Sequence, residues 1–274
     1  MSTHILKSYA KLNLALHLYP PRPDGYHPLH SIFQSITLHD TLTIILSKEK
    51  TYNLTTSDST LNNTTNLITK AYTLLQNDIP FGLSIHLEKQ IPIGGGLGGG
   101  SSNAGYFLQF LQQQLPSLSI QQLHTVSTQL GSDVPFFLTG ARAVVSGIGE
   151  TIEPLPASPQ AYVLINPNIL LPTPSIYQAF DNETPSTRTP QTTKNFLKQS
   201  TLGENDFKEI VWKNYPLYPI LETALNEAKL PPIYLSGSGA TVYMCADSQE
   251  HAQKLADKIQ ALFPGYWVRP THTL

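Results

Sequence analysis

The sequence predicts an α+β protein, in which strands and helices occupy separate stretches of the chain. Apolar and polar residues alternate at period two through much of the first 46 residues, which is typical of strands, whereas the longest helical patterns come after residue 100. This order, strands first and then helices, favours the α+β class over a doubly wound sheet, and no internal repeat is visible. Prolines at 154, 156 and 159 mark a domain boundary, and we expect one domain over residues 1–156 and another over 157–274.

Turn residues, caps and apolar spacing place the elements of the first predicted domain. Strands are expected over 5–18 and 31–46, with a turn over 20–25 between them and a break at His39-Asp40. Asn66 can cap a helix over 67–75, and a strand over 83–88 leads into a glycine run. The remaining elements are a helix that Ser101 or Ser102 can cap and Pro116 ends, a helix over 120–130, a turn over 131–135, and strands over 142–145 and 150–155.

The second predicted domain mixes strands and helices. A strand is expected over 161–165, a short helix from Pro172, and a mobile loop over the polar stretch 183–193. One or two helices follow over 205–229. The chain then closes with a strand–turn–strand over 232–245, a helix over 249–263 and a strand over 266–269.

Composition excludes several classes of protein. Only 13% of the residues are charged and the net charge is −2, which argues against general affinity for nucleic acid or an anionic membrane. Cys245 is the only cysteine, so no disulfide forms within the chain and a reducing compartment is expected. The first residues lack a signal-peptide pattern, and no apolar run is long enough to span a membrane. We therefore expect a cytoplasmic protein.

The most informative feature is a glycine run that precedes a helical pattern. Six of the 17 glycines lie between Gly94 and Gly100. Glycines let the backbone approach a ligand closely, and a glycine loop followed by a helix N-terminus is a common phosphate cradle. The residues of this cradle are Pro92, Ile93, Gly94, Gly95, Gly96, Leu97, Gly98, Gly99, Gly100, Ser101 and Ser102.

Three other interpretations of the glycine run are weaker. Its spacing satisfies G-x-G-x-x-G, but a dinucleotide site needs an acidic residue about 20 positions later, and no charged residue lies between Gln90 and Ser132. A P-loop would need a Gly-Lys-Ser/Thr sequence, which is absent. A flexible linker does not fit the well-patterned strand and helix on either side.

Two charged residues are candidates for a role in phosphoryl transfer. Lys11 and Asn13 lie on the same face of the first predicted strand, although a solvated strand face is the simpler interpretation. Asp133 is the first charged residue after Lys89, and it could equally act as a turn or helix cap. Beside a phosphate cradle, however, a carboxylate can accept a hydroxyl proton while an ammonium offsets charge on the transferred group.

These motifs together resemble the GHMP kinases. Lys11-Leu-Asn13, Pro92–Ala104 and Leu235–Val242 occur in the order found in that superfamily. The resemblance implies an N-terminal domain like ribosomal protein S5 domain 2, a ferredoxin-like C-terminal domain, and an active site in the interdomain cleft. It implies Lys11 and Asp133 as the catalytic pair and the glycine run as the holder of the ATP phosphates. It places Asn66, Lys89 and Asn103 near the adenosine.

Within the superfamily, the sequence of these motifs is most similar to that of the branch that acts on a cytidine diphosphate-linked alcohol. Five segments between residues 10 and 242 carry this similarity, among them Arg22–His27 and Gly131–Phe137. It implies ATP-dependent phosphorylation of the 2-hydroxyl of a methylerythritol unit, in the non-mevalonate route to isoprenoid precursors. The implied substrate-binding residues are Asn13, Tyr26, His27, Phe33, Tyr177 and Gly239. Tyr177 is a mild departure, because this branch often has Phe at that position.

Several alternatives remain at this level. Tyr26 and Phe33 could be core residues, and the His27/His30 spacing could suggest zinc, although no third ligand is in view. The acceptor could instead be a homoserine-like or mevalonate-like molecule, or the chain could be a nucleotide-binding module without activity. Mg²⁺ is expected with ATP, and Ser102 is the one candidate ligand. We expect small-molecule partners only, and a monomer or weak homodimer.

Overall fold

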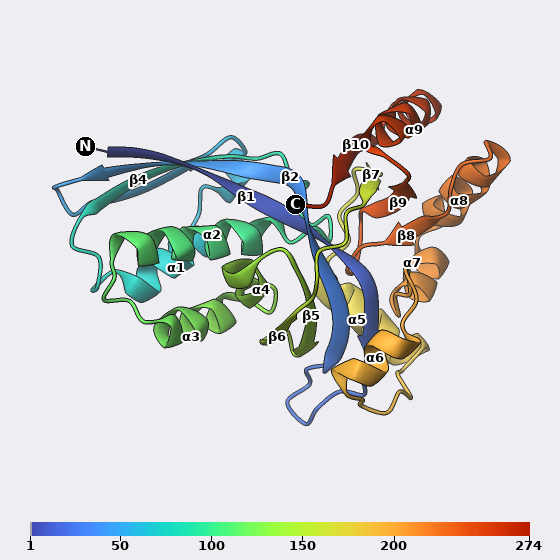
Figure 1. Ribbon diagram of the computed structural model, residues 1–274, viewed down its shortest axis with the longest axis horizontal. Coiled ribbons are helices and arrows are strands. Elements are labelled where there is room, and N and C mark those ends of the chain that lie inside the picture. The colour runs from blue at the N-terminus through green and yellow to red at the C-terminus, as the bar shows by residue number, and fades with distance from the viewer. Residues whose placement is uncertain (1) are drawn as a thin grey trace. The chain divides into compact units, whose positions relative to one another are not determined.

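The computed structural model describes residues 2–274 and divides them into strands and helices that largely match the sequence analysis (Figure 1). The strands are β1 (Ser2–Leu18), β2 (Leu29–Ser47), β3 (Tyr52–Thr56), β4 (Gly82–Glu88), β5 (Arg142–Gly147), β6 (Thr151–Pro154), β7 (Ala161–Asn166), β8 (Ile233–Leu235), β9 (Val242–Ala246) and β10 (Trp267–His272). The α-helices are α1 (Leu67–Leu75), α2 (Gly99–Gln114), α3 (Ile120–Leu130), α4 (Val134–Thr139), α5 (Thr173–Glu183), α6 (Thr193–Gln199), α7 (Lys208–Asn214), α8 (Leu217–Glu227) and α9 (Gln249–Leu262).

The chain forms two compact units, each assembled from several segments. The first unit contains the N-terminal residues up to Ala10, together with Leu38–Pro92 and Gly98–Gly140. The second contains Lys11–Thr37, Ile93–Leu97 and Ala141–Leu274. The long strands β1 and β2 therefore contribute residues to both units, and the glycine run is divided between them. The domain boundary after residue 156 stays a prediction.

The first unit packs helices on one face of a sheet. In this sheet β4 lies between β3, which is parallel to it, and the second half of β2, which is antiparallel. Helices α1, α2 and α3 cover the sheet (Figure 1), and the core consists of residues such as Ile44, Ile85, Phe107 and Leu123. The helices over 67–75 and 120–130 are confirmed to the residue. Their amphipathic spacing is the reason, because one face of each meets this core.

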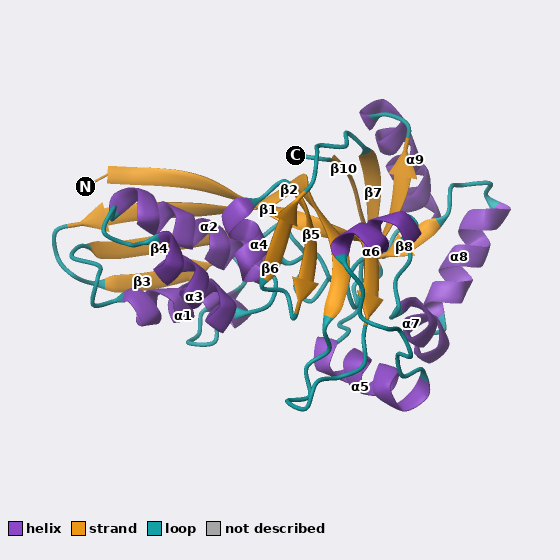
Figure 2. Ribbon diagram, turned by 60° about the horizontal axis from the view of Figure 1, so that its bottom comes forward, coloured by secondary structure: helices purple, strands orange, loops and turns teal. Residues whose placement is uncertain are grey.

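The second unit contains a four-stranded antiparallel sheet. Figure 2 shows its strands side by side in the order β10, β7, β9, β8, and helix α9 packs against it. The first half of β2 pairs with β5, which in turn pairs with β6. The strand–turn–strand predicted over 232–245 is confirmed as β8 and β9. With 35% helix and 29% strand, the predicted α+β class is confirmed.

Three local predictions are wrong, and one helix was not predicted, for identifiable reasons. Strand β2 has no break at His39-Asp40, because the Asp40 side chain is buried and bonded rather than turning the chain. Neither Ser101 nor Ser102 caps α2, whose N-cap is Gly98 in a left-handed conformation. Helix α4 begins inside the predicted turn, and helix α6 follows a polar stretch that gave no apolar pattern.

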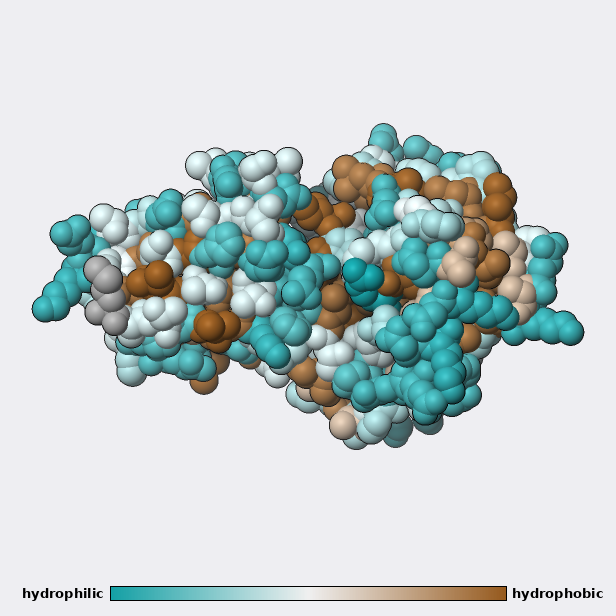
Figure 3. Space-filling model, turned by 90° about the horizontal axis from the view of Figure 1, so that it is seen from above, coloured by the Kyte–Doolittle hydropathy of each residue, from teal (hydrophilic) through white to brown (hydrophobic). Residues whose placement is uncertain are grey.

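The surface agrees with the low charge of the sequence. On the face drawn in Figure 3, hydrophobic residues are interspersed with hydrophilic and neutral ones. Across residues 2–274, no helix combines the length and the hydropathy that a membrane span requires.

Candidate active site

The first half of the glycine run, Ile93–Leu97, is held in the second unit by its carbonyl groups. The Ala240 N–H donates to the Gly94 carbonyl (3.3 Å) and the Thr241 N–H to the Gly95 carbonyl (3.1 Å). The Ser236 hydroxyl donates to the Gly96 carbonyl (3.0 Å). The next carbonyl, that of Leu97, accepts from the backbone N–H of Lys11 (3.0 Å). The Ser236–Gly239 turn, which sequence alone could not connect to the glycine run, is therefore bonded directly to it.

The backbone of the run has the conformation of an anion cradle. Gly94, Gly96 and Gly98 have positive φ angles of 66°, 71° and 70°. A left-handed conformation at every second residue is one way in which successive N–H groups are brought to converge on an anion. Residues with side chains adopt this conformation at a cost of about 1–2 kcal/mol each, so glycine is required here.

Gly96→Ala is expected to raise the KM for ATP at least tenfold. A Cβ at this position would lie 2.2 Å from the Ser236 carbonyl oxygen and 2.8 Å from that of Gly239, so the loop must shift. Steady-state kinetics with varied ATP measures the effect. Gly140→Ala is the matched control, because Gly140 has a similar φ of 69° but no atom within 4 Å of the added Cβ. An equal change of KM in both variants would contradict the assignment.

The second half of the run begins helix α2 in the first unit. Gly98 is the N-cap, and its carbonyl accepts the N–H of Ser102 (2.8 Å). The N-terminus of a helix carries unpaired N–H groups and a partial positive charge, which favour a phosphate. No charged side chain between Gln90 and Ser132 opposes this field. The glycines at 98–100 can thus present α2 to an anion.

Ser102 and Asn103 hold α2 against strand β1. The Ser102 hydroxyl donates to the Tyr9 carbonyl (2.6 Å), and the Asn103 amide oxygen accepts from the Ser8 hydroxyl (2.7 Å). Both side chains are buried. Their visible role is to anchor the helix, and a contact of either with ATP stays a prediction.

The residues that the structure describes do not supply a protein-built magnesium site. Among residues 2–274, no group of three or more His, Cys, Asp or Glu side chains is placed to hold a metal ion. Ser102, the one candidate ligand, is fully buried with its hydroxyl bonded to a carbonyl. Magnesium prefers several oxygen ligands and keeps some of its water. The donor set therefore does not fit a dedicated site, and no catalytic step is assigned to the metal here.

Asn66 and Lys89, predicted near the adenosine, both have structural partners. Asn66 caps α1, because its amide oxygen accepts the N–H of Ile68 (3.0 Å). The ammonium of Lys89 pairs with the buried carboxylate of Asp40. A further contact of either side chain with a nucleotide stays a prediction.

Asp40 is a supporting residue of the candidate site that the sequence analysis did not identify. Its Oδ1 accepts the backbone N–H groups of Gln90 (2.7 Å) and Ile91 (2.8 Å), just before the glycine run. Together with Lys89, these donors satisfy a carboxylate that has no exposed surface. Asp40 thereby fixes the chain that enters the run. The available signal was a single acidic residue within the predicted strand.

Lys11 is buried in a small polar cluster of the second unit. Lys11 is only 3% exposed. Its ammonium donates to the Asn13 amide oxygen and lies 4.4 Å from the centre of the Phe33 ring. The Asn13 amide nitrogen donates to the Ser31 hydroxyl (2.9 Å). The alternative of a solvated strand face is therefore wrong. The cation is held rigidly, and Lys11 is also bonded through its backbone to the glycine run.

Asp133 stands at the N-cap of α4 in the first unit. Its side chain makes no capping hydrogen bond to that helix, although it has other interactions. Helix α4 is fixed to α2, because the Gln109 amide donates to the carbonyls of Phe137 (3.0 Å) and Leu138 (2.9 Å). The carboxylate is half-buried and does not cap α4, so the helix-cap alternative loses its support.

Tyr26 and His27 occupy a tight turn in the second unit. Gly25 has φ +83°, and the Tyr26 N–H donates to the Asp24 carboxylate (3.2 Å). Tyr26 is 59% exposed, whereas His27 is buried with its Nδ1 2.8 Å from the Tyr19 carbonyl oxygen. The core alternative is wrong for Tyr26, whose ring is available for stacking.

The predicted site residues thus divide between the two units. The second unit brings together Lys11, Asn13, Phe33, Ile93–Leu97 and the turn ending at Gly239, and it also contains Tyr26, His27 and Tyr177. The first unit contains Asn66, Lys89, Gly98–Asn103 and Asp133.

Comparison with known proteins gives a consistent result. The family model described as "GHMP kinases N terminal domain" matches residues 66–141, and "GHMP kinases C terminal" matches residues 198–265. Curated relatives from Ralstonia pickettii (36% identity over 93% of this chain and 90% of the relative) and Thermodesulfovibrio yellowstonii (35% over 98% and 97%) are both named 4-diphosphocytidyl-2-C-methyl-D-erythritol kinase.

Solved structures show the same fold. A crystal structure of 4-(cytidine 5'-diphospho)-2C-methyl-D-erythritol kinase superposes with a TM-score of 0.81 at 29% identity, covering 99% of this chain and all of the other. Homoserine kinase from Cytophaga hutchinsonii superposes with a TM-score of 0.69 at 16% identity, over 100% and 95% of the two chains. The homoserine kinase match bears on the fold alone.

Proposed function

The chain belongs to the GHMP kinase family, and from that premise we propose that it phosphorylates the 2-hydroxyl of 4-diphosphocytidyl-2-C-methyl-D-erythritol with ATP. Relatives that share 32–36% of its residues over most of the chain are named for this substrate. The observation that carries the proposal within the structure is the backbone hydrogen bond from Lys11 to Leu97. It ties the predicted catalytic lysine to the loop predicted to hold the phosphates.

The proposed reaction is a direct phosphoryl transfer. The substrate hydroxyl oxygen forms a bond to the γ-phosphorus of ATP, and the bond between that phosphorus and the β–γ bridging oxygen breaks, releasing ADP. Asp133 accepts the hydroxyl proton, and the Lys11 ammonium offsets the charge on the transferred group. Because Lys11 is buried over the Phe33 ring, its charge acts in a medium where water screens it little.

Mg²⁺ enters the proposal only as a companion of ATP. When bound, it would neutralise part of the phosphate charge. In this proposal the phosphates are held by backbone groups of the glycine run and by the N-terminus of α2, whose conformations support that role. Both can bind an anion whether or not a metal accompanies it.

The remaining properties also stay part of the proposal. We expect a cytoplasmic enzyme that is a monomer or weak homodimer and that binds small molecules rather than nucleic acid or membrane. The low net charge of −2 supports the absence of a strong general affinity for polyanions.

A coupled ADP-release assay tests the function. The purified protein with ATP is given the cytidyl substrate, homoserine or phosphomevalonate in separate reactions. We expect turnover with the cytidyl substrate alone. Turnover with another acceptor would assign a different kinase activity, and ADP release with none of the three would favour a nucleotide-binding module.

Tyr26→Ala is expected to raise the KM for the cytidyl substrate about tenfold and to leave the KM for ATP unchanged, because base stacking on an aromatic ring is worth about 1–3 kcal/mol. Tyr26 is largely exposed, so its removal costs the fold little. Steady-state kinetics with each substrate varied in turn measures both constants. Tyr26→Phe, which keeps the ring, should behave as the parent protein. Equal changes for both substrates would refute the stacking role.

A further inference from the structure

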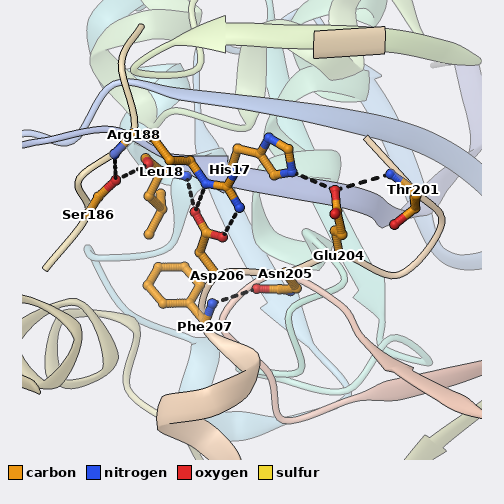
Figure 4. Close-up of polar contacts among 9 residues, drawn as sticks. All are labelled: His17, Leu18, Ser186, Arg188, Thr201, Glu204, Asn205, Asp206 and Phe207. Carbon is orange, nitrogen blue, oxygen red and sulfur yellow. Dashed lines mark hydrogen bonds and ion pairs between the residues drawn. The ribbon is translucent and has the colours of Figure 1, made fainter. Parts of the chain in front are cut away.

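The segment 203–207 lies along strand β1 in the second unit (Figure 4). The Leu16 N–H donates to the Glu204 carbonyl (2.8 Å), and the Leu16 carbonyl accepts the Asp206 N–H (3.1 Å). The Glu204 carboxylate lies 2.8 Å from Nε2 of the buried His17. The segment is therefore fixed to the strand that carries the predicted catalytic lysine, although the sequence analysis gave it no role.

Asp206 joins the end of β1 to the polar loop 184–192. Its Oδ2 accepts the Leu18 N–H (2.7 Å) and the Nε–H of Arg188 (3.0 Å), while its Oδ1 accepts an Nη2–H of the same guanidinium (2.8 Å) (Figure 4). Two parallel bonds between a guanidinium and a carboxylate form the strongest type of ion pair. The Ser186 hydroxyl adds a bond to the Leu18 carbonyl (2.6 Å). The loop is thus pinned to the strand.

This junction reaches His27 through the backbone. Leu18, which Asp206 holds, is followed by Tyr19, whose carbonyl oxygen lies 2.8 Å from Nδ1 of His27. Because a carbonyl only accepts, Nδ1 is the donor of this bond. Nε2 of the same ring lies 2.8 Å from the Asp181 carboxylate of α5. The position of Leu18 and the orientation of the His27 ring are therefore coupled.

The junction also reaches His27 through aromatic packing. Phe207 follows Asp206, is only 1% exposed, and packs edge-on against Tyr177 (4.7 Å between ring centres) and Phe180 (5.7 Å). Both of these α5 rings contact the His27 ring, at 5.5 and 6.0 Å. Asp206 is thus linked to the His27 ring through the backbone, and Phe207 is linked to the same ring through aromatic packing.

The neighbouring Asn205 acts on a different part of the site. Its amide nitrogen donates to the carbonyls of Leu235 (3.0 Å) and Gly237 (2.9 Å). These residues flank Ser236, whose hydroxyl donates to the Gly96 carbonyl (3.0 Å). Asn205 therefore supports the glycine run, whereas the residue after it supports the His27 corner.

We propose that Asp206 is a positioning residue that sets recognition of the cytidine end of the substrate, through its Arg188 and Leu18 contacts. The proposal rests on the proposed function, because it assigns the His27 corner to a cytidine-containing ligand. The physical basis is that a buried ring, held by one hydrogen bond at Nδ1 and by packing against the rings of α5, loses its orientation when one of these supports moves. Asp206 itself does not touch the reacting atoms.

Asp206→Asn tests the charge without removing the acceptor for Leu18. We expect the KM for the cytidyl substrate to rise about tenfold, while kcat and the KM for ATP stay within twofold, because the charge-assisted bonds to Arg188 are weakened and the reacting atoms are untouched. A purely structural role would change both KM values or neither, and either result would overturn the proposal.

Arg188→Gln provides a second variant, because Arg188 is exposed and its loss does not disturb the core. We expect a change in the same direction. Arg188→Lys should change the KM less, because lysine keeps the charge but lacks the two parallel donors of the guanidinium. Glu250→Gln is the matched control. It breaks an exposed ion pair with Lys254 on helix α9 of the same unit, whose two residues belong neither to the segment 203–207 nor to α5, and it should alter neither KM.

Two measurements are independent of turnover. Trypsin should cut after Arg188 several times faster in Asp206→Asn than in the parent, with cleavage after Lys194 as the internal reference. Calorimetry with cytidine 5'-diphosphate should show about tenfold weaker binding in the variant. If the parent protein neither binds this nucleotide nor turns over the cytidyl substrate, the proposed function fails. If the parent does both and the variant binds equally well, only the role of Asp206 fails.

Discussion

Replacing Asp133 by asparagine is expected to lower kcat by about 10²–10⁴-fold, the usual contribution of a positioned general base. Asparagine has nearly the same shape but cannot accept the hydroxyl proton. The Asp133 side chain makes no capping bond to α4, so the helix should not depend on its charge. Binding of ATP should be kept, because the glycine run and the N-terminus of α2 are unchanged.

Steady-state kinetics and calorimetric binding of an ATP analogue check this result together. Asp78→Asn is the matched control, since Asp78 is an exposed residue of the same unit and should be silent. Near-parental turnover in Asp133→Asn would show that the assigned role is wrong. Asp133→Ala should be as inactive as Asp133→Asn, because both remove the same proton acceptor.

Replacing Lys11 by methionine is expected to lower kcat by about 10²–10³-fold, the loss typical of removing one group that stabilises transition-state charge. The fold should tolerate the change at a modest cost. Removing the ammonium takes one donor from the buried Asn13 amide oxygen, which costs about 1–3 kcal/mol. Here the ammonium lies over the Phe33 ring, so methionine can occupy the same apolar surface.

Thermal unfolding measured beside kinetics separates the two roles of Lys11. We expect a Tm lowered by only a few degrees together with the loss of turnover. Lys7→Met is the matched control, because Lys7 is an exposed residue on the same strand. A lowered Tm with turnover reduced only in proportion to the unfolded fraction would mean that Lys11 is structural.

The elements that sequence predicted well are those whose pattern is local. The helices over 67–75 and 120–130 carry their own caps, Asn66 and Ser119, and their own apolar faces, so their bounds follow from neighbouring residues. Helix α6 and the uninterrupted course of β2 were missed, because the first lies beyond a polar loop and the second depends on a distant partner.

Asp40 shows why such a partner cannot be read from the chain. In isolation an aspartate within a strand indicates a break, since it favours turns. In the structure its carboxylate accepts N–H groups as far as 51 residues away and pairs with Lys89, which turns an apparent interruption into an anchor for the glycine run. Only folding brings these donors together.

By itself, the sequence determined the α+β class, the kinase family, and the chemistry-bearing residues Lys11, Asp133 and the glycine run as predictions. These depend on residue type and local spacing, which the chain carries without folding. The tertiary structure decided that Lys11 is buried and bonded to that run, that the Ser236–Gly239 turn is bonded to it as well, and that Asp206 supports the His27 corner. Each of these is a contact between segments that are distant in the sequence. Such contacts form only when folding brings the segments together, and they become strong once burial removes water from both partners.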